Sequence, residues 1–260
     1  MSNTNPVIVL KVGGALLQSE PGMAELMSVV AEMMQQGQKV IFVHGGGCLV
    51  DEQLEANGKQ TIKLEGLRVT PADQIPIVVG ALAGTSNKIL QAAAIKAGIV
   101  SVGMSLADGK IVNAKIKDEK LGLVGEVSPN DPSYLNYLLS QNWLPICSSI
   151  AISPTGDMLN VNADQAATAL AKLVSGQLVL LSDVPGVLDA KGELITQLNQ
   201  QQIAGLIEQG VIEKGMKVKV EAALEVAQWM GKAVQVASWK QPQQLIALTN
   251  GQSVGTQIQP

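Results

Sequence analysis

The sequence predicts an α/β protein, a three-layer α/β/α sandwich around one open and mainly parallel sheet. Short apolar runs rich in β-branched residues alternate along the chain with longer segments in which apolar residues recur every three or four positions. This alternation is typical of parallel strands joined by crossover helices. An apolar content of 47% with only 15% charged residues provides enough apolar surface to cover both faces of such a sheet.

Six apolar runs are expected to form the strands, and the longer segments between them the helices. The strands are expected at Val7–Val12, Lys39–His44, Ile99–Gly103, Leu144–Ser148, Leu178–Ser182 and Ala233–Ser238. The helical pattern is carried by Glu20–Gln36, Ala72–Ala97, Asp131–Gln141 and Asn162–Leu173.

Two stretches depart from this alternation, Asn57–Arg68 and Gly109–Ser128. Both alternate polar and apolar residues around turn residues, which predicts β-hairpins that lie over the sheet as lids. The chain has no linker or repeat that divides it, so residues 1–260 are expected to form a single domain. A weak candidate boundary at Asp157–Asn162 divides the chain into two approximate lobes, residues 1–157 and 158–260.

Composition excludes several classes of protein. A net charge of −4 and six aromatic residues give neither the basic field nor the stacking surface of a nucleic-acid-binding protein. One histidine and two cysteines are too few for a His-metal cluster or a disulfide framework, so no metal site of the protein's own is expected. The N-terminal residues lack a signal-peptide pattern and no apolar run is long enough for a membrane helix. A cytoplasmic protein is therefore expected.

Glycines gather after the first two expected strands. Gly13 and Gly14 follow the first, and Gly45, Gly46 and Gly47 follow the second. Successive glycines allow several backbone N–H groups to converge on one anion at the start of a helix. Each loop by itself is equally well an ordinary tight turn, but two such loops after adjacent strands favour an anion site. Neither a P-loop nor a G-x-G-x-x-G sequence occurs, which disfavours P-loop NTPases and classical dehydrogenases.

Polar residues of the same regions suggest phosphoryl transfer. Lys11 lies in an apolar strand just before Gly13, and Asp164 lies near the start of an alanine-rich helix. Asn160 and Asn162 lie close to Asp164 in the sequence. Capping of the helix by Asn162, with Asp164 as a first-turn carboxylate, explains one or two of these three residues but not all of them. Lys217 and Lys219 stand at the start of another helix, where an anionic ligand would offset the unfavourable helix dipole. Lysines, glycine loops and a carboxylate suit phosphoryl transfer, which depends on positioning and charge neutralisation.

Seven motifs occur in order along nearly the whole chain and resemble the N-acetylglutamate kinases within the amino acid kinase family. They are KVGG, HGGGCLVDE, GLRVTPADQ, GALAGTSNK, NVNADQAATALA, LLSDVPGVLD and GMKVKVEAA. The resemblance implies a short bacterial enzyme of arginine biosynthesis that uses ATP with Mg²⁺ to phosphorylate the side-chain carboxylate of N-acetyl-L-glutamate. It also implies two lobes on one continuous sheet, with acetylglutamate over the N-terminal lobe and ATP over the C-terminal lobe.

The resemblance also implies roles for particular residues. Lys11 and Lys219 would flank the transferring phosphoryl group, with Asp164 holding both lysines, and Gly14 and Gly46 would donate backbone N–H groups to it. His44 is expected to be a strand-end residue and not a catalyst. Acetylglutamate would be bound by Gly46, Gly47, Arg68 and Asn160. The nucleotide pocket would be lined by Asp183, Val184, Pro185, Gly186, Val187, Leu188, Val211, Ile212 and Glu213.

The same resemblance bears on assembly and on rival functions. It favours a homodimer through a helix over Ala72–Gly98. Arginine-inhibited members are hexamers with an extra N-terminal helix, and only Met1 to Pro6 precede the first expected strand, so insensitivity to arginine is expected. The alternatives are another kinase of the family, acting on glutamate, aspartate, carbamate or UMP, or an inactive ligand-binding protein of the same fold.

Overall fold

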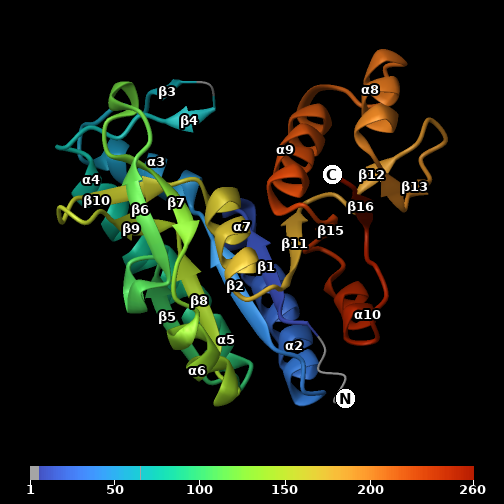
Figure 1. Ribbon diagram of the computed structural model, residues 1–260, viewed down its shortest axis with the longest axis horizontal. Helices are drawn as coiled ribbons and strands as arrows, with labels where there is room; N and C mark the ends of the chain where they lie inside the picture. Colours follow the sequence, from blue (N-terminus) through green and yellow to red (C-terminus); the bar gives the residue numbers. More distant parts are fainter. Residues whose placement is uncertain (1–5, 65) are drawn as a thin grey trace.

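The computed structural model describes residues 6–64 and 66–260 and is built around an eight-stranded sheet (Figure 1). Its strand order is β14-β16-β15-β11-β1-β2-β8-β5. The six predicted strands all form and pair in parallel, as β1 (Ile8–Val12), β2 (Val40–His44), β5 (Ser101–Ser105), β8 (Leu144–Ser148), β11 (Gln177–Ser182) and β15 (Val234–Ser238). Two short strands, β14 (Gln197–Leu198) and β16 (Thr256–Ile258), extend one edge, and β16 is antiparallel to β15.

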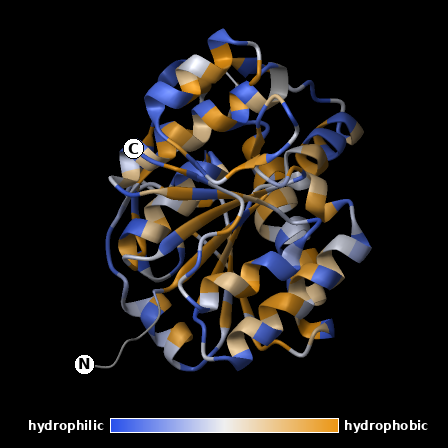
Figure 2. Ribbon diagram, turned by 90° about the vertical axis from the view of Figure 1, so that its right-hand side faces the viewer, coloured by the Kyte–Doolittle hydropathy of each residue, from blue (hydrophilic) through white to orange (hydrophobic). Residues whose placement is uncertain are grey.

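Alternation within the central strands divides the core between two faces of the sheet. In β1, Ile8, Leu10 and Val12 pack into one apolar cluster, whereas Val9 packs into the other. The helices that contribute to the first cluster include α2 (Glu20–Gln35), α5 (Asn87–Lys96) and α10 (Ile246–Thr249). The helices of the second are α6 (Ser133–Ser140), α7 (Ala163–Leu173), α8 (Gln200–Glu208) and α9 (Lys214–Met230). Figure 2 shows the apolar strands enclosed between helices, which confirms the predicted three layers.

Helix α7 begins where the sequence pattern predicts. The Asn162 side chain accepts hydrogen bonds from the backbone N–H groups of Asp164 and Gln165, at 2.8 and 3.2 Å, so the capping interpretation of Asn162 is confirmed. Small alanine side chains then allow the helix to approach β1 and β2 closely. The first turn of α7 is thereby fixed at the carboxyl ends of these strands.

The predicted helix over Ala72–Ala97 forms with an irregular centre. It consists of α4 (Ile75–Val79), the π-helical segment η1 (Gly80–Ser86) and α5, with helical backbone dihedrals at each junction. A π segment widens the turn and so changes the direction of the side chains that follow it. Nothing in the apolar spacing indicated this segment.

The predicted hairpin in Gly109–Ser128 forms as β6 (Val112–Ile116) and β7 (Val124–Pro129). It is not a separate lid, however, because β7 pairs in parallel with β10 (Met158–Val161), which pairs with β9 (Ile150–Ile152) in a four-stranded sheet. The expected lobe boundary after residue 157 falls between the paired strands β9 and β10. Strand β10 therefore packs with the N-terminal elements.

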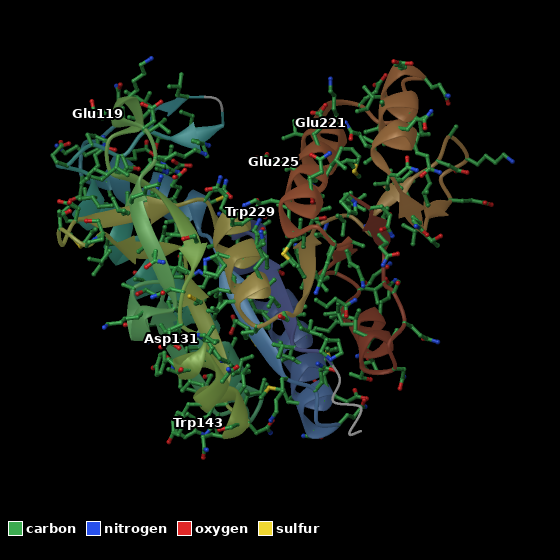
Figure 3. The ribbon with its side chains drawn as sticks, viewed as in Figure 1. Glu119, Asp131, Trp143, Glu221, Glu225 and Trp229 are labelled. Atoms are coloured by element: carbon green, nitrogen blue, oxygen red, sulfur yellow. The ribbon has the colours of Figure 1, made fainter. Side chains whose placement is uncertain are left out.

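The second predicted hairpin consists of β3 (Lys63–Leu64) and β4 (Leu67–Arg68). Thr70 joins it to the tip of the larger hairpin, because its N–H donates to Leu121 O at 2.9 Å and its carbonyl accepts from Leu123 N–H at 2.7 Å. Figure 3 labels Glu119 at this tip, near β3 and β4 in Figure 1. The two hairpins thus meet at one end of the molecule.

The remaining elements are one ten-residue helix, α3 (Gly47–Ala56), and several shorter ones. The shorter ones are α1 (Gly14–Leu17), η2 (Asp108–Lys110), η3 (Glu119–Leu121), β12 (Val187–Leu188), β13 (Leu194–Ile195) and η4 (Pro242–Leu245). Within the described ranges, every helix is too short or too polar to traverse a bilayer. The expectation about the segment before the first strand falls on residues 1–5, which lie outside the described residues.

Candidate active site

The two glycine loops lie side by side at the carboxyl ends of β1 and β2. Gly13 precedes α1 in extended conformation, and Gly46 precedes α3. A Cβ built on Gly14 would lie 3.6 Å from the backbone nitrogen of Gly47. The backbone of the first loop therefore contacts the start of the second helix, as expected for one shared anion site.

Two of the three loop glycines after β2, Gly45 and Gly46, have neighbours that limit the space for a side chain. At Gly46 a Cβ would lie 3.0 Å from Leu82 Cδ2 and in closer conflict with Ser86 Oγ. At Gly45 it would lie 3.3 Å from Ala163 Cβ, at the start of α7. Gly45 and Gly46 thus let the loop pass closely between η1 and α7, and the loop becomes exposed at Gly47.

Lys11 and Asp164 form an ion pair at the same edge of the sheet. Lys11 Nζ lies 2.9 Å from Asp164 Oδ1, with exposed side-chain fractions of 18% and 29%. Lys11 is on the face of β1 that α7 covers, and Asp164 is in the first turn of α7. The lysine is held beside the glycine loops and remains partly accessible, which permits it to meet an anionic ligand.

Lys219 does not share this partner. It pairs with Asp183, the residue that follows β11, and this corrects the expectation that Asp164 holds both lysines. Asp183 lies within reach of Lys219 in the early turns of α9, and Asp164 is already paired with Lys11. The hydrogen bond from Lys219 holds the pKa of Asp183 below its usual range, so this carboxylate stays ionised.

A pocket of about 230 Å³ opens between the glycine loop, the small hairpin and β10. All four residues expected to bind the substrate line it, namely Gly46, Gly47, Arg68 and Asn160. Gly45, which was expected at the anion site, also lines it. The remaining lining residues were not predicted from the sequence as site residues: Val50, Lys63, Gly66, Leu67, Leu82, Val124, Ser149, Val161, Asn162 and Ala163. Lys63 is a second cationic side chain in the pocket besides Arg68. Its position in the expected hairpin Asn57–Arg68 is the feature of the sequence that could have identified it.

Arg68 is oriented by a fixed set of acceptors. Its Nη1 donates to Asp51 Oδ1 at 2.6 Å and Thr61 Oγ1 at 2.7 Å, and its Nη2 donates to Gly47 O at 3.2 Å. Burial disfavours the charged Asp51, but the hydrogen bonds from Arg68 and Thr61 outweigh it and lower the pKa of Asp51. These bonds use three of the five guanidinium N–H groups, and two are left for a ligand carboxylate.

Asn160, on β10, lines the same pocket as Arg68, on β4. Its Nδ2 donates to Thr70 Oγ1 at 3.1 Å, and Thr70 Oγ1 donates to Arg68 O at 3.2 Å. The polar residues of the pocket are therefore linked to one another through Thr70, where the two hairpins meet. A ligand that contacts Asn160 also contacts this junction.

The expected nucleotide-binding residues are only partly accessible. Val187 and Ile212 are buried at 0% and 1% exposure in the core with α7 and α9, so their side chains do not line an open surface, contrary to expectation. Gly186 has φ of 147°, and a Cβ there would meet the backbone nitrogen of Thr256 at 3.0 Å. The accessible members are Asp183, Val184, Pro185, Leu188, Val211 and Glu213.

Comparison with a protein-family model decides the family. The model of the amino acid kinase family matches residues 6–238. The chain belongs to the amino acid kinase family. Curated relatives of this amino acid kinase include the acetylglutamate kinases of Shewanella denitrificans, 76% identical, and Shewanella putrefaciens, 74% identical, each over 260 residues and the full length of both chains.

Solved structures agree with this family fold. The smu.665 protein of Streptococcus mutans has a TM-score of 0.78 at 30% identity, over 97% of this chain and 98% of that one. A carbamate kinase from Giardia lamblia bound to AMP-PNP has a TM-score of 0.67 at 18% identity, over 99% of both chains. At that identity the second likeness shows the fold alone.

Proposed function

We propose that this amino acid kinase transfers the γ-phosphoryl group of ATP to the side-chain carboxylate of N-acetyl-L-glutamate, yielding N-acetyl-L-glutamyl 5-phosphate for arginine biosynthesis. The observation that carries the proposal is the single pocket lined by Gly46, Gly47, Arg68 and Asn160. Identity of 74–76% to acetylglutamate kinases along the full chain supports the choice of acceptor over other kinases of the family.

In this proposal the chain supplies charge and orientation, with little acid–base work. A carboxylate acceptor is already ionised, so the reaction needs no base to remove a proton. Arg68 and Asn160 bind the substrate, and the backbone N–H groups of Gly14 and Gly46 donate to the phosphoryl group and the attacking carboxylate. Lys11, held by Asp164, neutralises charge on the transferring oxygens.

Lys219 is proposed to offset the negative charge that develops on the leaving bridge oxygen of ATP. For this it exchanges part of its interaction with Asp183 for the phosphates. Lys219 and Asp183 are 38% and 48% exposed, so the exchange involves groups already in contact with solvent. Residues 158–260 would then supply the nucleotide site, and residues 1–157 together with Asn160 on β10 the acetylglutamate site.

Mg²⁺ is proposed to arrive with ATP. Across residues 6–64 and 66–260 no group of three or more His, Cys, Asp or Glu side chains is arranged to hold a metal ion. Magnesium in kinases is bound mainly by substrate phosphates and water with one or two carboxylates, which fits this arrangement. It would offset phosphate charge, and Asp164 and Asp183, which pair with Lys11 and Lys219, are the carboxylates proposed to contact it.

A cytoplasmic homodimer is proposed, with Ala72–Gly98 in the interface. Ile95 on α5 is 62% exposed, and Val100 just beyond this segment is 59% exposed, so both are apolar side chains that a second copy could cover. Light scattering should give twice the 27.2 kDa chain mass, and Ile95→Glu should shift it toward one chain. A monomeric or hexameric unmodified protein would exclude this assembly.

The hairpins are proposed to close over bound acetylglutamate and exclude water. Adding N-acetylglutamate with a non-hydrolysable ATP analogue should slow amide hydrogen exchange in 57–68 most strongly, because 109–128 is already held in the four-stranded sheet. Helix α6, which lies outside the pocket lining, is the internal control. Equal exchange in 57–68 with and without ligands would argue against closure.

The function itself is tested by trapping the acyl phosphate with hydroxylamine. With ATP present, N-acetylglutamate should give a hydroxamate, whereas glutamate should give far less because it lacks the acetyl group. Faster hydroxamate formation from glutamate or aspartate would assign the chain to another kinase of the family. No hydroxamate from any of these carboxylate acceptors would contradict the proposal and leave a carbamate or UMP kinase, or a ligand-binding role.

A further inference from the structure

Two fully buried polar residues lie directly behind the glycine loop. His44 is the last residue of β2 and Asn87 is the first residue of α5, and both are 0% exposed. Burial of polar side chains is costly unless they are hydrogen-bonded, so their partners show what they hold in place. His44 contacts the loop at the Gly45 carbonyl, and Asn87 contacts His44.

The orientation of Asn87 follows from two backbone carbonyls. Its Nδ2 lies 2.8 Å from Ile146 O and 3.3 Å from Met104 O, and carbonyl oxygens only accept hydrogen bonds. The atom that faces them must therefore be the amide nitrogen. Gly103 makes room for this side chain, because a Cβ there would conflict with Asn87 Oδ1.

This orientation fixes the tautomer of His44. Asn87 Nδ2 also lies 3.1 Å from His44 Nε2, closer than Met104 O at 3.3 Å, so its two hydrogens are shared among three acceptors. Because an amide nitrogen cannot accept a hydrogen bond, Nε2 is the acceptor and the ring proton is on Nδ1. Nδ1 lies 2.8 Å from the carbonyl oxygen of Gly45, to which it donates. Burial lowers the pKa of His44 to about 4, although the bond to Gly45 opposes this, so the ring is neutral at pH 7.

The Gly45 carbonyl and the Gly46 N–H belong to one planar peptide unit. A hydrogen bond to the carbonyl therefore fixes the direction of the N–H and polarises it toward an anion. We propose that His44 is a positioning residue, held in its tautomer by Asn87, that aims the Gly46 N–H at the reacting carboxylate and phosphoryl group. This rests on the proposed role of Gly46. The need for it arises from three consecutive glycines, which by themselves leave the peptide free to rotate.

Three variants separate positioning from folding. His44→Gln keeps an acceptor for Asn87 but removes the donor to Gly45, whereas His44→Asn places an amide donor where Nδ1 stands. Gln38→Leu is the matched control, since Gln38 is 1% exposed near the opposite end of β2 and its Nε2 donates to Pro6 O and Lys39 O. His44→Gln should lower kcat about tenfold or more with KM for N-acetylglutamate within about threefold, and His44→Asn should recover most of the loss.

The control should lower the melting temperature without this loss of kcat. Wild-type kcat in folded His44→Gln, or an equal loss in His44→Gln and His44→Asn, would overturn the proposal. If the variants do not fold, long-range ¹⁵N NMR of the unmodified protein still tests it, because a protonated Nε2 at pH 7 would also overturn it. The Gly46 amide resonance should also shift when N-acetylglutamate and an ATP analogue bind. If it does not shift, Gly46 does not contact the ligands, and both its proposed role and this inference are overturned.

Discussion

Replacing Lys11 by alanine is expected to lower kcat by about 10²- to 10³-fold while KM for acetylglutamate changes little. The reason is that Lys11, held 2.9 Å from Asp164, acts mainly on charge that develops during transfer. Steady-state kinetics with each substrate varied in turn measures both parameters. Lys219→Ala should give a loss of similar size through the leaving oxygen.

Lys39→Ala is the control for this result. Lys39 directly precedes β2 (Val40–His44) and so lies at the end of the sheet opposite the glycine loops. Its replacement should leave kcat unchanged, which would show that loss of a lysine as such does not inactivate the protein. Near wild-type turnover in Lys11→Ala would remove Lys11 from the mechanism.

Arg68→Ala is expected to raise KM for acetylglutamate by about 10- to 100-fold, with little change in KM for ATP. A guanidinium that is only 10% exposed and already oriented by Asp51 and Thr61 binds a carboxylate at small entropic cost. Removing it costs binding in the ground state, so kcat should fall less than in Lys11→Ala.

Arg68→Lys separates charge from geometry. Lysine keeps the positive charge but cannot form the paired N–H bonds of a guanidinium, so KM should lie between those of the unmodified protein and Arg68→Ala. An unchanged KM for acetylglutamate in Arg68→Ala would place the substrate carboxylate elsewhere in the pocket, with Lys63 as the next cation to test.

Much of the central sheet could be predicted from the sequence because its signals are local. An apolar strand such as Val40–His44 is recognisable by itself, and so is the start of α7 at Asn162. The glycine loops were predictable as neighbours, since parallel strands end at the same edge of a sheet. That Gly46, Gly47, Arg68 and Asn160 line one pocket followed from the family resemblance.

Other features depend on contacts between distant segments. The pairing of β7 with β10 joins segments more than thirty residues apart, so the hairpin at 109–128 could be predicted but not its place in a sheet. The Asp183 partner of Lys219 and the burial of Val187 depend likewise on how α9 packs. The role of His44 required the orientation of Asn87, which follows a π-helical segment without a sequence signal.

The most direct test of the central claim is to follow the bond that forms. N-acetylglutamate labelled with ¹⁸O in its side-chain carboxylate, incubated with this chain and Mg·ATP, should give an acyl phosphate whose ³¹P resonance carries the isotope shift of a bridging ¹⁸O. A shifted resonance shows that the substrate carboxylate attacked phosphorus. Formation of ADP with only unlabelled inorganic phosphate, or no consumption of ATP, would contradict the proposed reaction.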